Sequence, residues 1–285
     1  MPVLTLREIR KRIRGAQKTQ QITKTMQMVA ASRLKKSEEK LRQSRPYFEK
    51  MEMILRHLQQ SESEFNHPFF QPREVKSIGL VVVTSDRGLA GAYNSNVIAR
   101  AEEFLLEPRS QTVKLALIGK KGYDHFRKRD WPILLKQVDI AGKPDFQKIS
   151  DIMHQIVQFY RSGEVDAVYL IYTKYFSAMS IKPTVVKFLN LQLEGDAKPV
   201  QTILEPSLDE ILEQFLPQYI ASKMFISLVE AFTAENSARM VAMKTATDNA
   251  KEMIERLTLQ RNKARQAAIT KEILEIVTAG EALKA

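Results

Sequence analysis

Hydrophobic residues recur at intervals of three and four along both ends of the chain, which is the spacing of an amphipathic α-helix. Residues 3–45 contain one glycine, Gly15, and no proline before Pro46. Their apolar stripe consists of Leu6, Ile9, Ile13, Ala16, Ile22, Met26, Val29, Leu34 and Leu41. The pattern predicts a long helix over 3–45. Because the steps from Ala16 to Ile22 and from Val29 to Leu34 break a strict heptad, any supercoil should be irregular.

A longer helix is predicted near the C-terminus, between Pro217 and Gly280. Residues 218–279 are 62 residues with neither glycine nor proline, and as a helix they would extend about 93 Å. One coiled-coil register contains Val229, Phe232, Met243, Ala246, Ala250, Met253, Leu257, Ala264, Ala267 and Leu274,. Asn236, Arg239, Gln260 and Lys271 share this register and weaken the seam. Alanine-rich positions on both segments allow their backbones to approach closely, and the chain between them has room to return, so we expect the two helices to pair antiparallel. Their length and polar faces argue against the alternative of two buried helices in an ordinary bundle.

The middle of the chain alternates between two kinds of segment. Runs of strand length are 78–84, 113–118, 133–138, 167–173 and 184–189, with helical stretches at 94–106, 122–129 and 146–160,. This alternation predicts a layered α/β fold with mostly parallel pairing. The expected architecture is an antiparallel coiled-coil shaft, made of an N-terminal helix segment, 1–67, and a C-terminal helix segment, 207–285, with a central Rossmann-like α/β domain, 68–206.

Composition excludes several classes of protein. The 285 residues include no cysteine, so disulfides, thiolate nucleophiles and cysteine-bound zinc are excluded. The densest apolar run, 78–83, is far shorter than the roughly 18 residues that a membrane span requires,. The start of the sequence has no signal-peptide pattern, and a cytosolic location is expected.

The charge is concentrated at one end of the chain. The net charge is +11, and residues 1–45 carry 13 Lys or Arg against three Glu. A basic segment of this kind favours a polyanion or an acidic protein surface. A basic coiled-coil protein that binds nucleic acid is therefore one alternative, although residues 1–46 contain no aromatic side chain on which a base could stack,.

The chain contains one loop in the position of a phosphate-binding loop, Thr84 to Gly91, between a predicted strand and a predicted helix. It lacks both the dinucleotide-binding glycine fingerprint and the Gly-Lys-Ser/Thr ending of a P-loop, as does 119–122. We interpret it as a structural turn, with an α/β enzyme as a second alternative. The four histidines, His57, His67, His125 and His154, have no metal-ligand spacing. No catalytic, cofactor-binding or metal-binding residue is predicted.

Three blocks of sequence carry a resemblance to a known family. The first is residues 21–33, Gln-Ile-Thr-Lys-Thr-Met-Gln-Met-Val-Ala-Ala-Ser-Arg. The second is the loop 84–91, continuing to Asn94, and the third is 234–250 followed by 262–273. Together with the order helix, globule, helix, they resemble the gamma subunit of rotary F-type ATP synthases over essentially the whole chain.

The resemblance implies a central rotor shaft. Its partners would be three alpha and three beta subunits that form the catalytic ring, the epsilon subunit and the membrane proteolipid ring, with no nucleic acid and no direct membrane insertion. The shaft would couple H⁺ or Na⁺ translocation to ATP synthesis or hydrolysis by rotation, without a catalytic site or cofactor of its own. The expected location is the cytoplasmic face of a bacterial cell membrane, as a peripheral protein.

The resemblance also implies contact residues. Met26 would lie near the hinge loop of the beta subunit, and Arg265, Gln266, Thr270 and Glu275 would meet the catch loops of the ring. Glu205 resembles the foot position near the membrane ring. The tail, with Ile276, Val277, Ala282 and Leu283, would sit in an apolar bearing.

Overall fold

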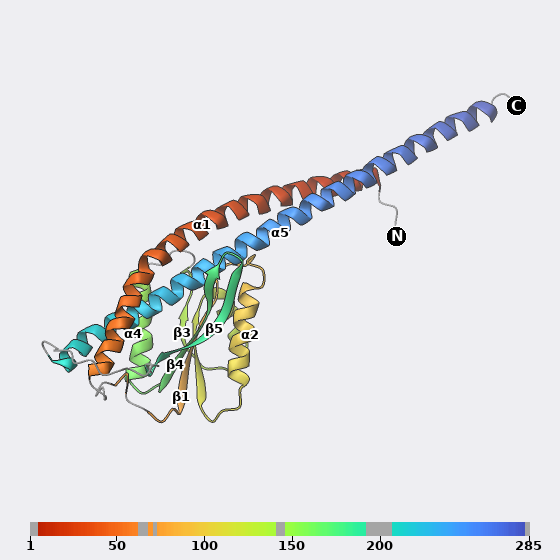
Figure 1. Ribbon diagram of the computed structural model, residues 1–285. Helices are drawn as coiled ribbons and strands as arrows, with labels where there is room; N and C mark the ends of the chain where they lie inside the picture. The colour runs from red at the N-terminus through yellow and green to blue at the C-terminus, as the bar shows by residue number, and fades with distance from the viewer. Residues whose placement is uncertain (1–4, 62–67, 71–72, 141–145, 192–206, 283–285) are drawn as a thin grey trace. The chain divides into compact units, whose positions relative to one another are not determined.

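The computed structural model describes residues 5–61, 68–70, 73–140, 146–191 and 207–282. These residues belong to two compact units. One unit comprises the chain up to Val29 together with the chain from Met240 onward, and the other comprises Ala30–Arg239. Helices α1 (Leu6–Ser61) and α5 (Leu208–Ala282) contribute to both units (Figure 1).

A five-stranded sheet forms the centre of the unit Ala30–Arg239. Its strands are β1 (Ser77–Val83), β2 (Thr112–Ile118), β3 (Ile133–Gln137), β4 (Ala167–Ser177) and β5 (Ser180–Leu189), in the order β3-β2-β1-β4-β5. The pairings among β3, β2, β1 and β4 are parallel, and β5 pairs antiparallel with β4. The predicted α/β fold with mostly parallel pairing is confirmed.

Helices cover both faces of this sheet. Between the strands lie α2 (Tyr93–Leu106), α3 (Lys120–Phe126) and α4 (Phe146–Arg161), and α2 and α4 lie on opposite sides of the sheet in Figure 1. The central strand β1 is buried at every position except its first, as expected for a parallel strand covered on both faces,.

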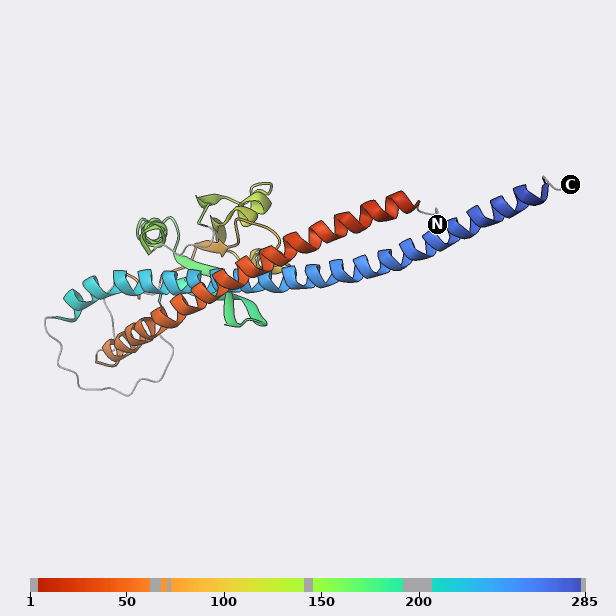
Figure 2. The same cartoon turned by 90° about the horizontal axis from the view of Figure 1, so that it is seen from above.

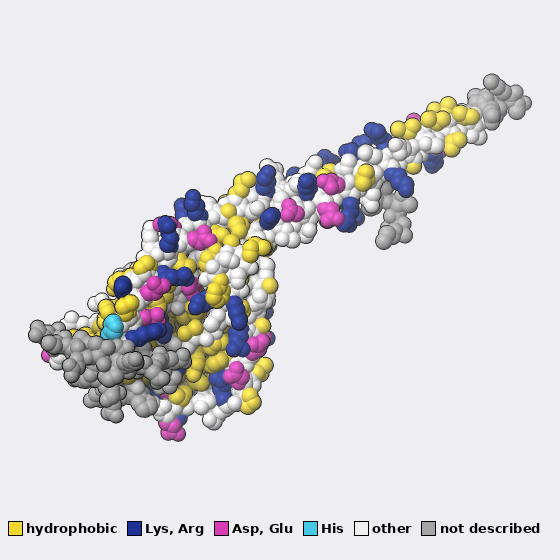
Figure 3. Space-filling model, in the orientation of Figure 1, with side chains coloured by type: hydrophobic (Ala, Val, Ile, Leu, Met, Phe, Trp, Pro, Cys, Tyr) yellow, Lys and Arg dark blue, Asp and Glu magenta, His cyan; other side chains and the backbone are white. Residues whose placement is uncertain are grey.

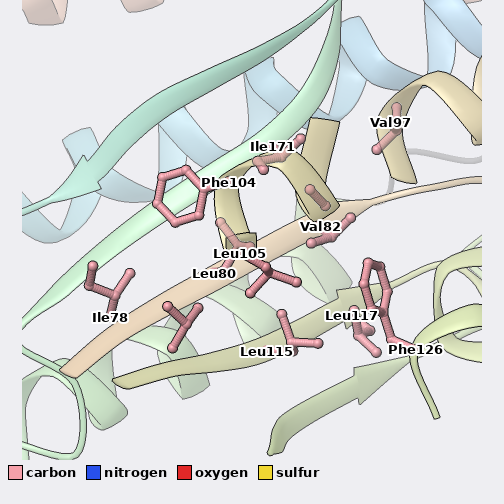
Figure 4. Packing of buried hydrophobic residues seen from close by; sticks show 12 residues of the cluster. Ile78, Leu80, Val82, Val97, Phe104, Leu105, Leu115, Leu117, Phe126 and Ile171 are labelled. Atoms are coloured by element: carbon pink, nitrogen blue, oxygen red, sulfur yellow. The ribbon is translucent and has the colours of Figure 1, made fainter. Parts of the chain in front are cut away.

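An extensive apolar cluster fills the space between α2 and the sheet. Alternate residues of β1 and β2 point into it and meet Val97, Phe104 and Leu105 of α2 (Figure 4). Leu80 and Leu115 are fully buried there. Period-two alternation of aliphatic residues places every second side chain on this face and makes it continuous with the apolar face of α2.

Both long helices contain a proline that was expected to lie outside them. Pro46 lies inside α1 and Pro217 inside α5, so the predicted helix limits at these prolines were wrong. An interior proline removes one backbone hydrogen bond and costs about 3 kcal/mol. The Phe48 and Tyr219 rings, two residues after these prolines, stack with centroids 5.8 Å apart, and such a pair returns about 0.5–1.5 kcal/mol of the cost.

The middle of α5 is buried on all sides. Every residue from Met224 to Ser237 is buried, whereas an ordinary surface helix buries one stripe. This segment therefore forms part of the core of its unit.

The buried residues of α1 follow a strict heptad, so the breaks predicted in its apolar stripe were wrong. Buried or half-buried positions recur at steps of four and three at Ile9, Ile13, Ala16, Gln20, Thr23, Gln27, Ala30, Leu34, Ser37, Leu41, Ser44, Phe48, Met51, Leu55 and Leu58. Ile22 and Val29, which were expected in the stripe, are 60% and 48% exposed. The apparent breaks arose because polar residues occupy several seam positions.

In the unit that contains the chain ends, α1 and α5 pair antiparallel. Ile9 and Ile13 pack against Leu257, and the Thr247 hydroxyl donates to Thr23 Oγ1 at 2.8 Å. Residue numbers rise along α1 as they fall along α5, which confirms the predicted orientation. The seam of α5 continues through Ile254 and Arg261 and ends at Ala264.

Three apolar residues predicted for the α5 seam, Met253, Ala267 and Leu274, are instead exposed. Met253 is 55% and Leu274 is 60% exposed. Ile254, next to Met253, is the less exposed of the two and takes the seam position. The sequence does not show which of two adjacent apolar residues faces the seam. The C-terminal end of α5 extends past the start of α1 in both Figure 1 and Figure 2, and Ala267 and Leu274 follow the last seam residue, Ala264.

Gly119 should tolerate no side chain. Its φ is +97°, and a Cβ would lie 2.1 Å from the Thr84 carbonyl oxygen. We expect Gly119→Ala to lower the free energy of unfolding by roughly 3 kcal/mol, from strain and the clash, as measured by chemical denaturation of the full-length chain.

Gly15→Ala is the matched control. Gly15 lies in α1, and an added methyl group would meet nothing within 4 Å, so helix propensity should make this change stabilising by about 0.5–1 kcal/mol. Equal effects of the two substitutions would contradict the close approach at Gly119.

Candidate functional site

The strand order locates the crevice where a ligand would bind in a doubly wound sheet. Sheets of this kind bind ligands at the carboxyl ends of the strands, where the strand order reverses. Here that point lies between β1 and β4, because β2 follows β1 on one side and β4 lies on the other. The turn Thr84 to Gly91 leaves the carboxyl end of β1 at this crevice.

Backbone amides around this turn bind acceptors from the chain itself. Asp86 Oδ1 accepts from the N–H groups of Lys120, at 2.9 Å, and Asp139, at 3.1 Å. The Ser85 N–H donates to Asn94 Oδ1 at 2.9 Å. A carboxylate of the protein thus occupies the position that a phosphate takes at the start of a helix, which favours a structural role for the turn.

Groups of α5 bind residues at the same edge of the sheet. The Tyr93 hydroxyl donates to the Ala231 carbonyl at 3.1 Å. Arg239 donates to the carbonyls of Arg87 and Gly88 at 3.4 Å and pairs with Glu235 at 2.7 Å. Groups of α5 therefore bind the turn after β1 and the start of α2, at the edge of the sheet where a nucleotide-binding protein of this fold would hold its cofactor,.

The ion pair of Glu235 and Arg239 is largely removed from water. The two side chains are 7% and 10% exposed. Burial raises the pKa of Glu235, and the Arg239 guanidinium opposes this rise. From the sequence, Arg239 was expected only as a seam residue, and Glu235 was not singled out. The signal that could have found this pair is the presence of two acids, Glu230 and Glu235, inside the otherwise apolar run that begins at Met224.

Titratable groups elsewhere form local pairs. His125 Nε2 lies 2.9 Å from Glu102 Oε1, and Arg129 contacts the same carboxylate at 2.8 Å. Among the residues that the structure describes, no group of three or more His, Asp or Glu is placed to hold a metal ion. No described helix is both long enough and apolar enough to cross a membrane.

Most of the residues predicted to contact other subunits lie on the C-terminal part of α5, which is exposed. All side chains from Arg265 to Ala279 are exposed. Four residues predicted to make contacts, Arg265, Gln266, Thr270 and Glu275, lie there. Within α5, the Thr270 hydroxyl donates to the Gln266 carbonyl at 3.0 Å, and Lys271 lies 3.6 Å from Glu275.

Apolar side chains are exposed on the same stretch. Ile269, Ile273, Leu274, Ile276 and Val277 are between 47% and 66% exposed, and Figure 3 shows apolar side chains along this part of α5. Contiguous exposed apolar surface on a soluble protein marks an interaction site. Of the predicted tail residues, Leu283 lies outside the described residues, and so does the foot residue Glu205.

Met26 lies in a different setting on α1. It is half-buried, and nearby Ile22 and Met28 are each 60% exposed. The Lys and Arg side chains of this helix up to Lys24 are all exposed. The early part of α1 thus presents a basic surface that also carries exposed apolar side chains.

Comparison with solved structures defines the class of protein. A chain of the Tetrahymena thermophila mitochondrial ATP synthase central stalk and c-ring superposes with a TM-score of 0.60 and 27% identity, covering 79% of this chain and 99% of that one. A chain of the Euglena gracilis mitochondrial ATP synthase, in a structure of OSCP, F1 and c-ring, shares the fold with a TM-score of 0.69 at 20% identity, covering 98% and 94%. The fold is that of a central-stalk subunit of rotary ATP synthase.

Sequence comparison identifies the family. The family model described as ATP synthase matches residues 5–283. The ATP synthase gamma chains of Desulfitobacterium hafniense and Protochlamydia amoebophila are each 42% identical, over 278 and 283 residues, covering 98% of this chain and 99% of each relative. The chain belongs to the ATP synthase gamma chain family and has the role of a rotor subunit.

Arg239→Met should destabilise the chain in a pH-dependent way. Without the guanidinium, the pKa of Glu235 rises further above its usual value, so the folded state binds a proton that the unfolded state releases,. Stability is therefore lost as pH rises above the usual glutamate pKa. We expect a loss of about 3–5 kcal/mol at pH 8 and a smaller loss at pH 5, measured by urea denaturation at both pH values.

Arg256→Met is the matched control on the same helix. Arg256 pairs with Glu252 on an exposed face, where both side chains are more than half exposed. Its loss should cost about 0.5 kcal/mol or less at either pH. An Arg239→Met variant whose loss is the same at pH 5 and pH 8 would contradict the buried-pair account.

Proposed function

We propose that the chain is the central shaft of a bacterial F-type ATP synthase, turning inside a ring of three alpha and three beta subunits. The observation that carries the proposal is the C-terminal part of α5, a helix that exposes polar and apolar side chains alike from Arg265 to Ala279. A helix of this composition needs apolar cover, and a surrounding ring of other subunits supplies it.

The mechanism rests on a mismatch of symmetry. A single asymmetric shaft presents a different face to each of three chemically equal sites in a pseudo-threefold ring, so the three sites take different conformations at any moment. Rotation of the shaft passes each conformation from site to site. Translocation of H⁺ or Na⁺ through the membrane proteolipid ring turns the shaft in the synthesis direction, and ATP hydrolysis turns it the other way.

The chain itself has no catalytic site in this proposal. The support is the crevice at the end of β1, where Asp86, Asn94 and Arg239 use the polar groups that a nucleotide would need. Nucleotide chemistry belongs to the ring. Membership in the gamma chain family also favours the shaft over the alternative of a nucleic-acid-binding coiled coil.

Specific contacts are assigned by the family resemblance. Arg265, Gln266, Thr270 and Glu275 would meet the catch loops of the ring, and exposure of all four supports this assignment. Met26 and the exposed basic residues of α1 would face acidic hinge segments of the beta subunits. Exposed charges make contacts of about 0.2–1 kcal/mol, which suits interactions that must break at each step.

The remaining assignments concern the end of the shaft near the membrane. Glu205 would lie close to the proteolipid ring, and the segment 68–206 would carry the epsilon subunit. Segments 1–67 and 207–285 would form the shaft. The complex would be peripheral, on the cytoplasmic face of the cell membrane.

Reconstitution with alpha and beta subunits tests the proposal. A fluorescent bead or rod attached to an introduced cysteine at Lys128, in the α/β part, should rotate in one direction under ATP. Because the chain has no cysteine of its own, this label is unique on the chain. Full three-site cooperative turnover with this chain omitted would overturn the proposal.

Replacing Arg265 and Gln266 together with alanine should weaken assembly or coupling. Both side chains are exposed, so the fold should keep its melting temperature. The measurement is rotational torque and the yield of assembled complex. Lys251→Ala, a change on an exposed residue of the same helix, is the control, and a double variant with unchanged torque and yield would remove both residues from the contact surface.

A further inference from the structure

Glu230 is a buried acid whose partners come from two other elements. It lies on α5, and its side chain is 8% exposed. Arg45 of α1 donates to Glu230 Oε1 at 3.1 Å, and the Tyr172 hydroxyl of β4 donates to Oε2 at 3.1 Å. One carboxylate thus joins α1, α5 and the sheet, all within the unit Ala30–Arg239.

The spacing of buried residues on α1 does not by itself define a unique register against a second helix. Along α1 the buried positions Ala30, Leu34, Ser37 and Leu41 repeat at steps of four and three. A small or aliphatic residue that moves by one turn meets a similar hole, since knobs-into-holes packing repeats along a helix. A buried charge differs, because it leaves its partner behind when it moves and remains unpaired in a dry site.

Two further contacts connect the helices to β4 and its hairpin. The Tyr175 hydroxyl donates to the Glu38 carboxylate of α1. The Ser237 hydroxyl of α5 donates to the Ala178 carbonyl, between β4 and β5. Burial beside Glu230 raises the pKa of Tyr172, so its hydroxyl stays protonated and remains a donor. Together with the contact between Tyr172 and Glu230, these two contacts link both helices to β4 and the turn that follows it.

We propose that Glu230 is a register lock, a positioning residue that fixes α5 along its axis against α1 and β4 through Arg45 and Tyr172. The inference rests on the proposed rotor function for its consequence. A shaft transmits torque only if its two helices do not slip past each other. Slippage by one turn would separate Glu230 from both partners, and the cost of the unpaired charge opposes that slippage.

An all-apolar replacement separates register from stability. The triple variant Arg45→Met, Tyr172→Phe, Glu230→Leu removes the carboxylate together with both of its partners, and Ser227, which also contacts Tyr172, keeps its hydrogen bond to the Lys223 carbonyl. The melting temperature should therefore stay within about 4 °C of the parent. Arg45→Met alone leaves the carboxylate without its cation and should melt roughly 10 °C lower. Arg42→Met is the control, because Arg42 is 77% exposed and pairs with Glu39 on α1 itself.

The register is measured directly by pulsed electron paramagnetic resonance. Spin labels at Lys36→Cys on α1 and Gln218→Cys on α5 occupy exposed positions in a chain without native cysteine. The parent and Arg42→Met should each give one distance. The triple variant should give a second population displaced by about 5 Å, one helical turn, and complexes that contain it should pump fewer ions per ATP.

A triple variant that keeps one distance and full coupling overturns the lock. The lock is also overturned if the number of ions pumped per ATP follows the melting temperature of the variants and does not follow the label distance. The proposed function fails if complexes with the parent chain show no coupled pumping. This outcome is distinct from failure of the lock, because the label distances are measured on the chain without any partner subunit.

Discussion

The structure depends on the complete burial of the middle of α5. From Met224 to Ser237 no side chain reaches solvent freely, so this stretch obeys the rules of a core element and not those of a surface helix. Every polar group on it must find a partner inside the protein. Glu230, Glu235, Ser237 and Asn236 all do so. The helix is therefore held by specific contacts as well as by apolar packing.

The same burial explains why the crevice is used by the chain's own groups. A doubly wound sheet normally leaves a binding site where its strand order reverses. Here Arg239 and the backbone near Ala231 bind the residues that border this site, and Asp86 supplies the anion for the neighbouring amides. A scaffold that binds nucleotides in other proteins serves here to hold a helix.

Much of the fold was predictable from local pattern, because strands such as β1 and helices such as α2 carry complete signals within their own residues. The predictions that failed concern residues whose environment is set by contacts with a distant part of the chain. The seam of α1 includes Gln20, Thr23 and Ser37, which are polar and become seam residues only because a second helix packs there. Pro46 and Pro217 were taken as limits because nothing local reveals the stacking of Phe48 on Tyr219. The contact residues, from Met26 to Glu275, rest on resemblance, since an exposed side chain gives no local sign of its partner.

The central claim is that the exposed C-terminal part of α5 is covered by other subunits in the working complex. The direct measurement is the rate of thiol modification of Ile273→Cys, first in the free chain and then after assembly with alpha and beta subunits that lack reactive cysteine. Ile273 is 56% exposed in the chain alone, so the free thiol should react quickly, and assembly should slow the reaction strongly. An equal rate in both states would contradict the account.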